Sequence, residues 1–180
     1  MVRLNFPETI ETKRLTLKRL RYEDAEEIFY SYASKPEATK YLAFRTHQSI
    51  EDARSFIVYA TAAWDNGNDY AFGIRMKENN RFIGSLGVIN ENGKVHFGYC
   101  ISPAQWGMGF ATEACMAVLE LLKKHKDVYR IWTFIDAENV TSGRVLIKCG
   151  LVEEARLTKW FRFVNQDNTP KDCILYILKE

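Results

Sequence analysis

Two glycines, Gly107 and Gly109, lie between a segment with the pattern of a strand and a segment with the pattern of a helix. Residues 95–101 alternate with a period of two, and residues 109–126 carry apolar side chains at helical spacing. Glycines at alternate positions let backbone N–H groups converge without interference from side chains. The start of a helix adds free N–H groups and the positive end of its dipole. This strand–turn–helix junction predicts an anion site suited to a diphosphate, and a plain glycine-rich loop is the alternative interpretation.

The residues around the two glycines narrow the class of phosphate ligand. A nucleotide P-loop ends in Gly-Lys-Ser/Thr, whereas residues 110–112 are Phe-Ala-Thr. The dinucleotide fingerprint is closer, because Gly107-x-Gly109 precedes a helix and Asp136 ends the next predicted strand. However, Thr112 stands at the place of the third glycine, and the preceding strands are predicted to be antiparallel. A nicotinamide or flavin site is therefore the weaker interpretation.

Hydrophobic periodicity assigns elements to the rest of the chain. Strands are expected at 13–20, 70–76, 82–89, 95–101 and 129–135, and two more on either side of 165–168. Helices are expected at 23–34, 36–42, 50–64, 109–126 and 141–149. Short turns join the three central strands into an antiparallel meander, and the strand at 129–135 is reached through a helix and should be parallel. The sequence predicts an α/β fold with a mixed, mostly antiparallel sheet and helices on both faces.

Length and charge limit the partners. A chain of 180 residues without repeat or linker predicts a single domain over residues 1–180. The net charge of +2, with the basic residues dispersed, disfavours nucleic acid as a partner. The sequence shows no signal-peptide core and no apolar run of membrane length, so we expect a cytoplasmic protein without a membrane partner. The cysteines are not spaced as zinc ligands and are expected to be free thiols, with no metal: Cys100, Cys115, Cys149 and Cys173.

Residues 96–101, His-Phe-Gly-Tyr-Cys-Ile, followed by residues 106–114, Trp-Gly-Met-Gly-Phe-Ala-Thr-Glu-Ala, resemble the coenzyme A-binding motif of the GNAT superfamily of N-acetyltransferases. The likeness is greatest to the RimJ/RimL-type branch of ribosomal-protein N-terminal acetyltransferases. Residues 11–15 resemble the opening strand of that branch, and residues 139–151 resemble its later asparagine, helix and turn. The resemblance implies a twisted sheet of about seven strands with splayed central strands, and acetyl-CoA as the donor in transfer to a primary amine.

The resemblance also implies residue roles. Backbone amides of Met108 to Thr112 hold the pyrophosphate, the strand end at 100–102 pairs with the pantetheine arm, and Asn139 contacts the arm across the cleft. The implied cofactor-binding residues are Cys100, Ile101, Ser102, Trp106, Gly107, Met108, Gly109, Phe110, Ala111, Thr112, Asn139 and Ser142. The chain departs from the family pattern in three places: Trp106 replaces Gln or Arg, Leu146 replaces the tyrosine that protonates the thiolate, and His96 replaces a frequent glutamate.

Acetyl transfer needs a neutral amine, a polarised thioester carbonyl and a proton for the thiolate. Ser142 is the candidate proton donor, with helix capping as its alternative role, and His96 is the candidate base, with an ordinary strand position as its alternative. Tyr99 is a candidate for the acceptor side or for the core. Positioning both substrates lowers the reaction barrier by about 7–11 kcal/mol at best. Proton transfer by a side chain raises the rate by on the order of 10²–10⁴. Positioning is therefore expected to contribute more than acid–base chemistry.

The acceptor is expected to be a peptide N-terminus or a small amine, because an α-amino group has a pKa near 8 against about 10.4 for lysine. It would bind between the first helices and the loop after Trp160. Aromatic side chains are candidates to line that cleft, and core positions are the alternative for most of them: Tyr32, Tyr41, Phe44, Trp64 and Trp160. A non-catalytic acetyl-CoA sensor is the alternative to an enzyme. The sequence leaves the oligomeric state open, a homodimer included.

Overall fold

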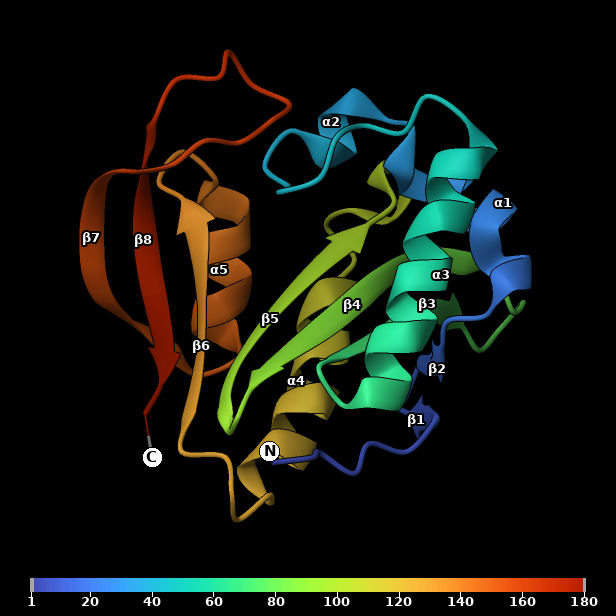
Figure 1. The fold of residues 1–180 in the computed structure, drawn as a ribbon, viewed down its shortest axis with the longest axis horizontal. Coiled ribbons are helices and arrows are strands. Elements are labelled where there is room, and N and C mark those ends of the chain that lie inside the picture. Colours follow the sequence, from blue (N-terminus) through green and yellow to red (C-terminus); the bar gives the residue numbers. More distant parts are fainter. Residues whose placement is uncertain (1, 180) are drawn as a thin grey trace.

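The structure is a computed structural model that describes residues 2–179 (Figure 1). Within this range the chain forms one eight-stranded sheet in the order β1-β2-β3-β4-β5-β6-β8-β7. The strands are β1 (Thr9–Glu11), β2 (Leu15–Arg19), β3 (Asp69–Met76), β4 (Phe82–Glu91), β5 (Lys94–Ile101), β6 (Arg130–Asp136), β7 (Leu151–Phe161) and β8 (Lys171–Leu178). The predicted α/β class and the mostly antiparallel sheet are confirmed, with one strand more than predicted.

The strand connections follow the local turn residues. Asn92 and Gly93 join β4 to β5 with φ values of 58° and 92°, as a two-residue Asn-Gly hairpin requires. Strands β1 to β5 are antiparallel neighbours in chain order. A helical crossover brings β6 parallel to β5, and the β7–β8 hairpin returns antiparallel to β6. The parallel crossover and the closing hairpin agree with the sequence analysis.

The principal helices are α1 (Ala25–Ile28), α2 (Pro36–Thr39), α3 (Ile50–Asn66), α4 (Phe110–Lys123) and α5 (Val140–Lys148). A π-helical turn, Phe29–Ala33, continues α1. The predicted capping box opens α3, because the Asp52 carboxylate accepts from the amides of Ser49 at 3.0 Å and Gln48 at 2.8 Å. Gly150 follows α5 with a φ of 88°, as the predicted left-handed cap requires. Helix α3 covers one face of the sheet, whereas α4 and α5 lie on the other (Figure 1).

Two apolar cores lie on the two faces of the sheet, here called the α3 face and the α4 face. On the α4 face, strand residues such as Phe97 and Ile101 pack with α4 and with Leu146 of α5. On the α3 face, Cys100 and Ala71 pack with α1 and α3. Strand β5 therefore alternates between the cores, so that His96 and Gly98 share the α3 face with Cys100. All four cysteines are buried free thiols.

Two boundaries differ from the sequence expectations. Residues 11–15 are not one opening strand, because the Thr12 amide and hydroxyl bond Leu15 and fold this segment into the turn between β1 and β2. The helix expected at 36–42 is the single turn Pro36–Thr39. Among residues 2–179, none of the helices combines the length and apolar character needed to cross a bilayer.

Candidate functional site

Strands β5 and β6 pair over only three residues and then diverge. The ladder joins Lys94 to Arg130, Val95 to Ile131 and His96 to Trp132. Beyond it, the Thr133 hydroxyl donates to the Phe97 carbonyl at 2.7 Å. Figure 1 shows the two strands separating above this point. The predicted splaying of central strands is confirmed, and this opening is called the split below.

The antiparallel ladder with β4 fixes which backbone groups of β5 face the split. The Ser102 amide donates to the Ile83 carbonyl of β4 at 2.7 Å. Because an antiparallel ladder alternates, the backbone groups of Cys100 also point toward β4, and those of Tyr99 and Ile101 point toward the split. The Trp106 indole N–H donates to the Ile101 carbonyl at 2.7 Å. The groups open to an incoming strand-like arm are therefore the amide and carbonyl of Tyr99 and the amide of Ile101, whereas Cys100 and Ser102 were expected as well.

The turn before α4 presents a fan of free amides. Gly107 and Gly109 have φ values of 77° and 79°, which favour glycine. Gly109 is the N-cap of α4, and no side chain caps the helix. Within the described part of the chain, the amides of residues 107–112 have no recorded acceptor. A Cβ on Gly107 would meet nothing within 4 Å, so this surface is open. Free donors at an open helix start fit a diphosphate.

A clasp from the β1–β2 turn braces the α4 start. Glu113 accepts from the Thr12 hydroxyl at 2.6 Å and the Arg14 amide at 2.7 Å, and it pairs with Arg14 Nε at 2.6 Å. Arg14 Nη1 also donates to the Met108 carbonyl at 2.9 Å. Burial would raise the pKa of Glu113, but the hydrogen bonds from Thr12 and Arg14 lower it overall. Arg14 thus places a cation beside the free amides, a contact that sequence reasoning missed.

A second hydrogen-bonded pair lies where α5 meets the split. The Asn139 side chain accepts from the Ser142 amide at 3.2 Å, which caps α5. The Ser142 hydroxyl is 2.9 Å from the Tyr99 hydroxyl. Burial raises the pKa of Tyr99, so its hydroxyl stays protonated. Leu146 is buried in the core. Tyr99, a candidate for the acceptor side, instead lies on the α4 face against Ser142.

His96 lies on the α3 face beside the last paired residues of β5 and β6. Its ring centroid is 5.0 Å from that of Trp132. Burial lowers the pKa of His96, with Glu91 acting in the opposite direction and Lys94 adding to the lowering. A row of aromatic rings continues from Trp132 along the edge of the split, through Phe134, Phe161 and Phe163.

The far end of the split is spanned by the loop between β7 and β8. Asn165 in this loop accepts from the Thr46 amide at 2.8 Å and donates to the carbonyls of Thr39 and Phe44 at 2.8 and 2.7 Å. A hollow of about 550 Å³ lies beside this Asn165 bridge, lined by residues of α2, of the segment after β6 and of the β7–β8 loop. The expected acceptor region thus contains a hollow.

The aromatic residues expected around the acceptor separate into two groups. Tyr32 is fully buried and bonds Ser85, and Trp64 packs against Tyr70 in the core. Tyr32 is therefore a core residue, whereas Trp64 is half-buried, packs against the core and lines the hollow described next. Phe44 and Trp160 are exposed and remain near the β7–β8 loop.

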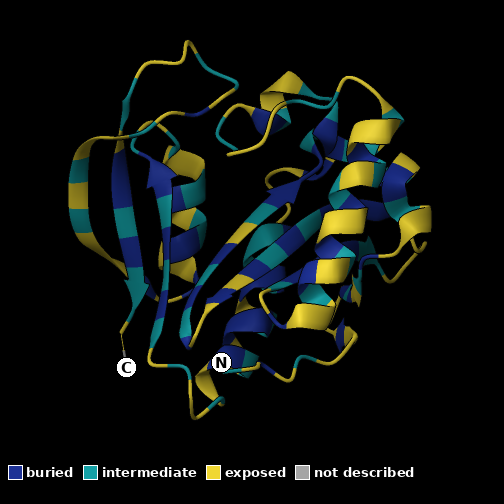
Figure 2. Ribbon diagram, viewed as in Figure 1, coloured by how far each residue is buried: buried dark blue, intermediate teal, exposed yellow. Residues whose placement is uncertain are grey.

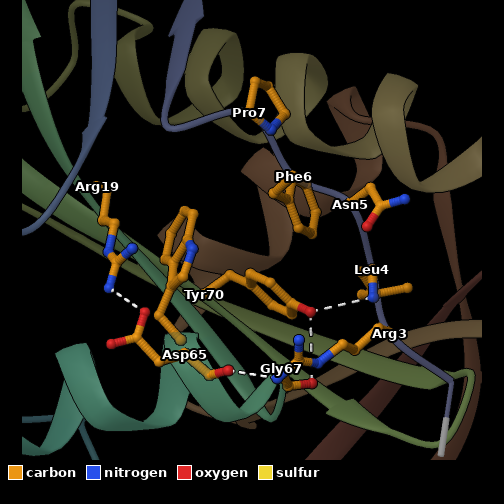
Figure 3. Close-up of a pocket in the computed structure, with 10 residues that line it drawn as sticks. Arg3, Leu4, Asn5, Phe6, Pro7, Arg19, Asp65, Gly67 and Tyr70 are labelled. Atoms are coloured by element: carbon orange, nitrogen blue, oxygen red, sulfur yellow. Dashed lines mark hydrogen bonds and ion pairs between the residues drawn. The ribbon is translucent and has the colours of Figure 1, made fainter.

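Another hollow, of about 490 Å³, lies where the N-terminal segment crosses the end of α3 (Figure 3). Its polar groups are paired with one another: Arg19 with Asp65 at 2.6 Å, and the Leu4 amide with the Tyr70 hydroxyl at 3.0 Å. Trp64, which was expected near the acceptor, lines this hollow, whereas the expected catalytic and cofactor-binding residues do not. We interpret this hollow as the place where the N-terminal segment packs against the end of α3. No cluster of three or more His, Cys, Asp or Glu in the described residues is arranged to hold a metal ion.

Comparison with known proteins agrees with this geometry. The family model described as acetyltransferase (GNAT) domain matches residues 14–152. The N-acetyltransferase YoaA of Bacillus subtilis (strain 168) is 30% identical over 170 residues, covering 93% of this chain and 94% of YoaA. Two solved structures have a TM-score of 0.85. The microcin C7 self-immunity acetyltransferase MccE, in complex with acetyl-CoA and AMP, is 19% identical, with 97% of each chain covered. RimL, the ribosomal L7/L12 alpha-N-protein acetyltransferase, in complex with coenzyme A, is 15% identical, with 94% of this chain and 97% of RimL covered.

Proposed function

Because this chain belongs to the GNAT family of N-acetyltransferases, we propose that it transfers the acetyl group of acetyl-CoA to a primary amine of low pKa. The α-amino group of a peptide is the first candidate, and a small-molecule amine is the second. RimL, which shares the fold, is an alpha-N-protein acetyltransferase by name. An α-amino group, with a reference pKa near 8, also needs less help from a base than a lysine near 10.4.

The observation that carries the proposal is the fan of free amides at the start of α4 beside the split. The N–H groups of Met108 to Thr112 hold the diphosphate, and the cation of Arg14 lies next to them. The arm then continues into the split, where the backbone of Tyr99 and Ile101 receives it as an added strand. Acetyl-CoA supplies the activated thioester. The chain's part is to place it against the amine.

The groups at the split can assist both halves of the transfer. The amine lone pair attacks the thioester carbon, and the Tyr99 amide donates to the oxygen that gains charge. Losing one such donor costs on the order of 10²–10³ in rate. The nitrogen of the adduct then loses one N–H proton to solvent and the C–S bond breaks. The departing sulfur takes the Ser142 proton, which solvent replaces. Either hydroxyl can donate in the Tyr99–Ser142 bond. With Tyr99 as the donor, the serine proton is free to point at the sulfur.

The test is thiol release from acetyl-CoA in the presence of three panels: peptides with free N-termini, N-terminally blocked peptides with internal lysines, and small amines. Turnover should be fastest with the free N-termini. If only internal lysines are acetylated, the preference for an α-amine is wrong. Uptake of coenzyme A without turnover against any amine would support a sensor instead. Thermal stabilisation by NAD or FAD but not by coenzyme A would support the dinucleotide interpretation.

A further inference from the structure

On the α3 face of the sheet, between α3 and the split, two paired strand positions carry no side chain, and this bare strip of backbone is called the trough below. Its floor is the cross-strand pair of Gly87 on β4 and Gly98 on β5. A Cβ on Gly98 would meet nothing within 4 Å. Gly98 is exposed and Gly87 is half-buried, and Figure 2 shows β4 and β5 alternating between buried and more exposed positions. The trough is therefore open to solvent directly beside the backbone of Tyr99, where the proposed function places the reacting carbonyl.

One carboxylate borders this trough. Asp69, the first residue of β3, pairs with Ile89, which pairs in turn with His96, so all three lie on the α3 face. Asp69 Oδ1 lies 3.7 Å from the position that a Cβ on Gly87 would occupy. This oxygen is buried and has no hydrogen-bond partner among residues 2–179. Burying an unpartnered charged oxygen costs stability, and native structures keep few such groups.

The surroundings of Asp69 contain few charges. The residues of α3 that face the sheet are apolar: Ala53, Ile57, Ala60 and Ala63. Burial raises the pKa of Asp69 to about 6, against a smaller lowering by the Tyr70 amide, and no neighbouring charge contributes. The titratable groups on the same face of β4 and β5 are Glu91, Lys94, His96 and the buried Cys100 thiol, whose pKa is raised by burial. The charges of Glu91 and Lys94 act on His96.

We propose that Asp69 is the catalytic carboxylate of the acceptor side: the acceptor's ammonium group lies in the trough over Gly98, and Asp69 holds it and takes its proton. This inference rests on the proposed function. One N–H bond of the ammonium breaks and the proton passes to the Asp69 carboxylate. The freed lone pair forms the C–N bond to the acetyl carbon, and the C–S electrons leave with the sulfur, which takes the Ser142 proton. The nitrogen of the adduct loses its second N–H proton to solvent, and solvent reprotonates Ser142. No further reactant is needed.

Asp69 is better placed than His96 to take the proton of the acceptor's ammonium group. Neighbouring strands lie about 4.8 Å apart, so a carboxylate over Gly87 is one strand away from an amine over Gly98. The His96 ring, in contrast, is packed against Trp132. A base with a pKa near 6 is ionised at neutral pH, binds a cation and can still accept its proton.

The first experiment compares Asp69→Asn with Asp127→Asn, which removes the same charge from an exposed residue after α4. The probe is acetyl-CoA with the best free-N-terminus peptide of the panel. Asp69→Asn should lower kcat/KM by about 10²- to 10⁴-fold and leave the Kd of coenzyme A unchanged. It should also abolish the fall in kcat/KM of the wild type below about pH 6. Asp127→Asn should behave as wild type.

A second measurement separates catalysis from structure. A folded pKa raised above the unfolded value means that stability is lost as pH rises through about 6. Asp69→Asn should therefore melt at a higher temperature than wild type at pH 8, and the difference should vanish near pH 4. If the carboxylate only stabilised the fold, Asp69→Asn would melt at a lower temperature than wild type at pH 8. Gly98→Val, which fills open space, should raise the KM for the peptide without changing coenzyme A binding.

The outcomes distinguish this inference from the proposed function. If the wild type turns over and Asp69→Asn keeps its rate and pH profile, Asp69 is not the base and only this inference fails. If Asp69→Asn melts lower than wild type at pH 8, the carboxylate is structural and the inference fails as well. If the wild type neither binds coenzyme A nor releases thiol with any amine, the proposed function fails and takes this inference with it.

Discussion

At the scale of single residues, three side chains leave the functional groups of the site free. Trp106 donates a hydrogen bond to the Ile101 carbonyl, and Arg14 donates one to the Met108 carbonyl. Asn139 accepts a hydrogen bond from the Ser142 amide. Each takes a backbone group that would otherwise compete for a partner. What remains open is a set of amides at the α4 start, and the Ser142 hydroxyl bonds only the Tyr99 hydroxyl. The site is therefore defined by the groups that stay unpaired.

Arg14 supplies the first prediction at this scale. Arg14→Ala removes a cation and the hydrogen bond to the Met108 carbonyl, and hydrogen bonds to charged groups contribute about 1.5–3 kcal/mol. The Kd of coenzyme A, measured by calorimetry, should rise about ten- to a hundredfold. Lys13→Ala, which removes an exposed charge one residue away, is the control and should change it little. Equal effects from both variants would mean that only net charge matters.

Ser142 supplies the second prediction. Ser142→Ala removes the hydroxyl that faces Tyr99 and keeps the α5 cap, because Asn139 bonds the Ser142 amide. We expect kcat to fall about 10²-fold with an unchanged Kd for coenzyme A. Thr141→Ala removes a hydroxyl from the same turn of α5 at an exposed position and should be neutral. A rate in Ser142→Ala equal to wild type would remove Ser142 from the mechanism.

At the scale of elements, the order of strands and helices follows from local patterns. The period-two segments gave the meander β3–β5, and Ser49 with Asp52 gave the start of α3. The site contacts are different in kind. Tyr99 and Ser142 are 43 residues apart, and Arg14 and Glu113 are 99 apart. No periodicity records a pair so distant, so the sequence predicted the turn and its amides but neither the Arg14 clasp nor the Tyr99–Ser142 pair.

The turn between β1 and β2 shows why one local prediction failed. Residues 13–20 alternate as a strand should, but Thr12 bonds Leu15 through its amide and hydroxyl. A side chain that bonds its own backbone competes with strand pairing. The turn also brings Arg14 to Glu113, so the failed assignment and the missed functional contact have the same physical cause.

The Asn165 bridge supplies a prediction for elements, because it joins the β7–β8 loop to the segment after α2. Asn165→Ala leaves the carbonyls of Thr39 and Phe44 and the Thr46 amide without this partner, at a cost of about 1–3 kcal/mol. We expect a lower Tm and a higher KM for the peptide, with coenzyme A binding preserved. Asn165→Asp keeps the acceptor and loses both donated bonds, so it should fall between wild type and Asn165→Ala.

At the scale of the whole molecule, three ladder pairs between β5 and β6 join two parts of one sheet. Strands β1 to β5 carry the free amides of the arm site, and β6 to β8 carry the Asn165 bridge. Few backbone bonds therefore cross the split. An arm that pairs with the β5 edge would add contacts between the two parts.

Coenzyme A should accordingly stabilise the protein as a unit. At 100 times its Kd, a ligand that binds only the folded state adds about 2.7 kcal/mol, which for a chain of this size raises Tm by about 5–11 °C. Amide exchange should slow on β5 near Tyr99 and Ile101, and at the α4 start. Protection confined to the α4 start would show that the arm does not pair with β5.

A gap that opens on both faces of a sheet has a practical consequence for inhibition. In the arrangement we propose, the thioester reaches it from the α4 face and the amine from the α3 face. One molecule with the coenzyme sulfur linked to the acceptor nitrogen could then pass through the sheet. Such a bisubstrate ligand would make the second binding event intramolecular. Its two ends could be optimised separately, because the walls that contact them belong to different helices.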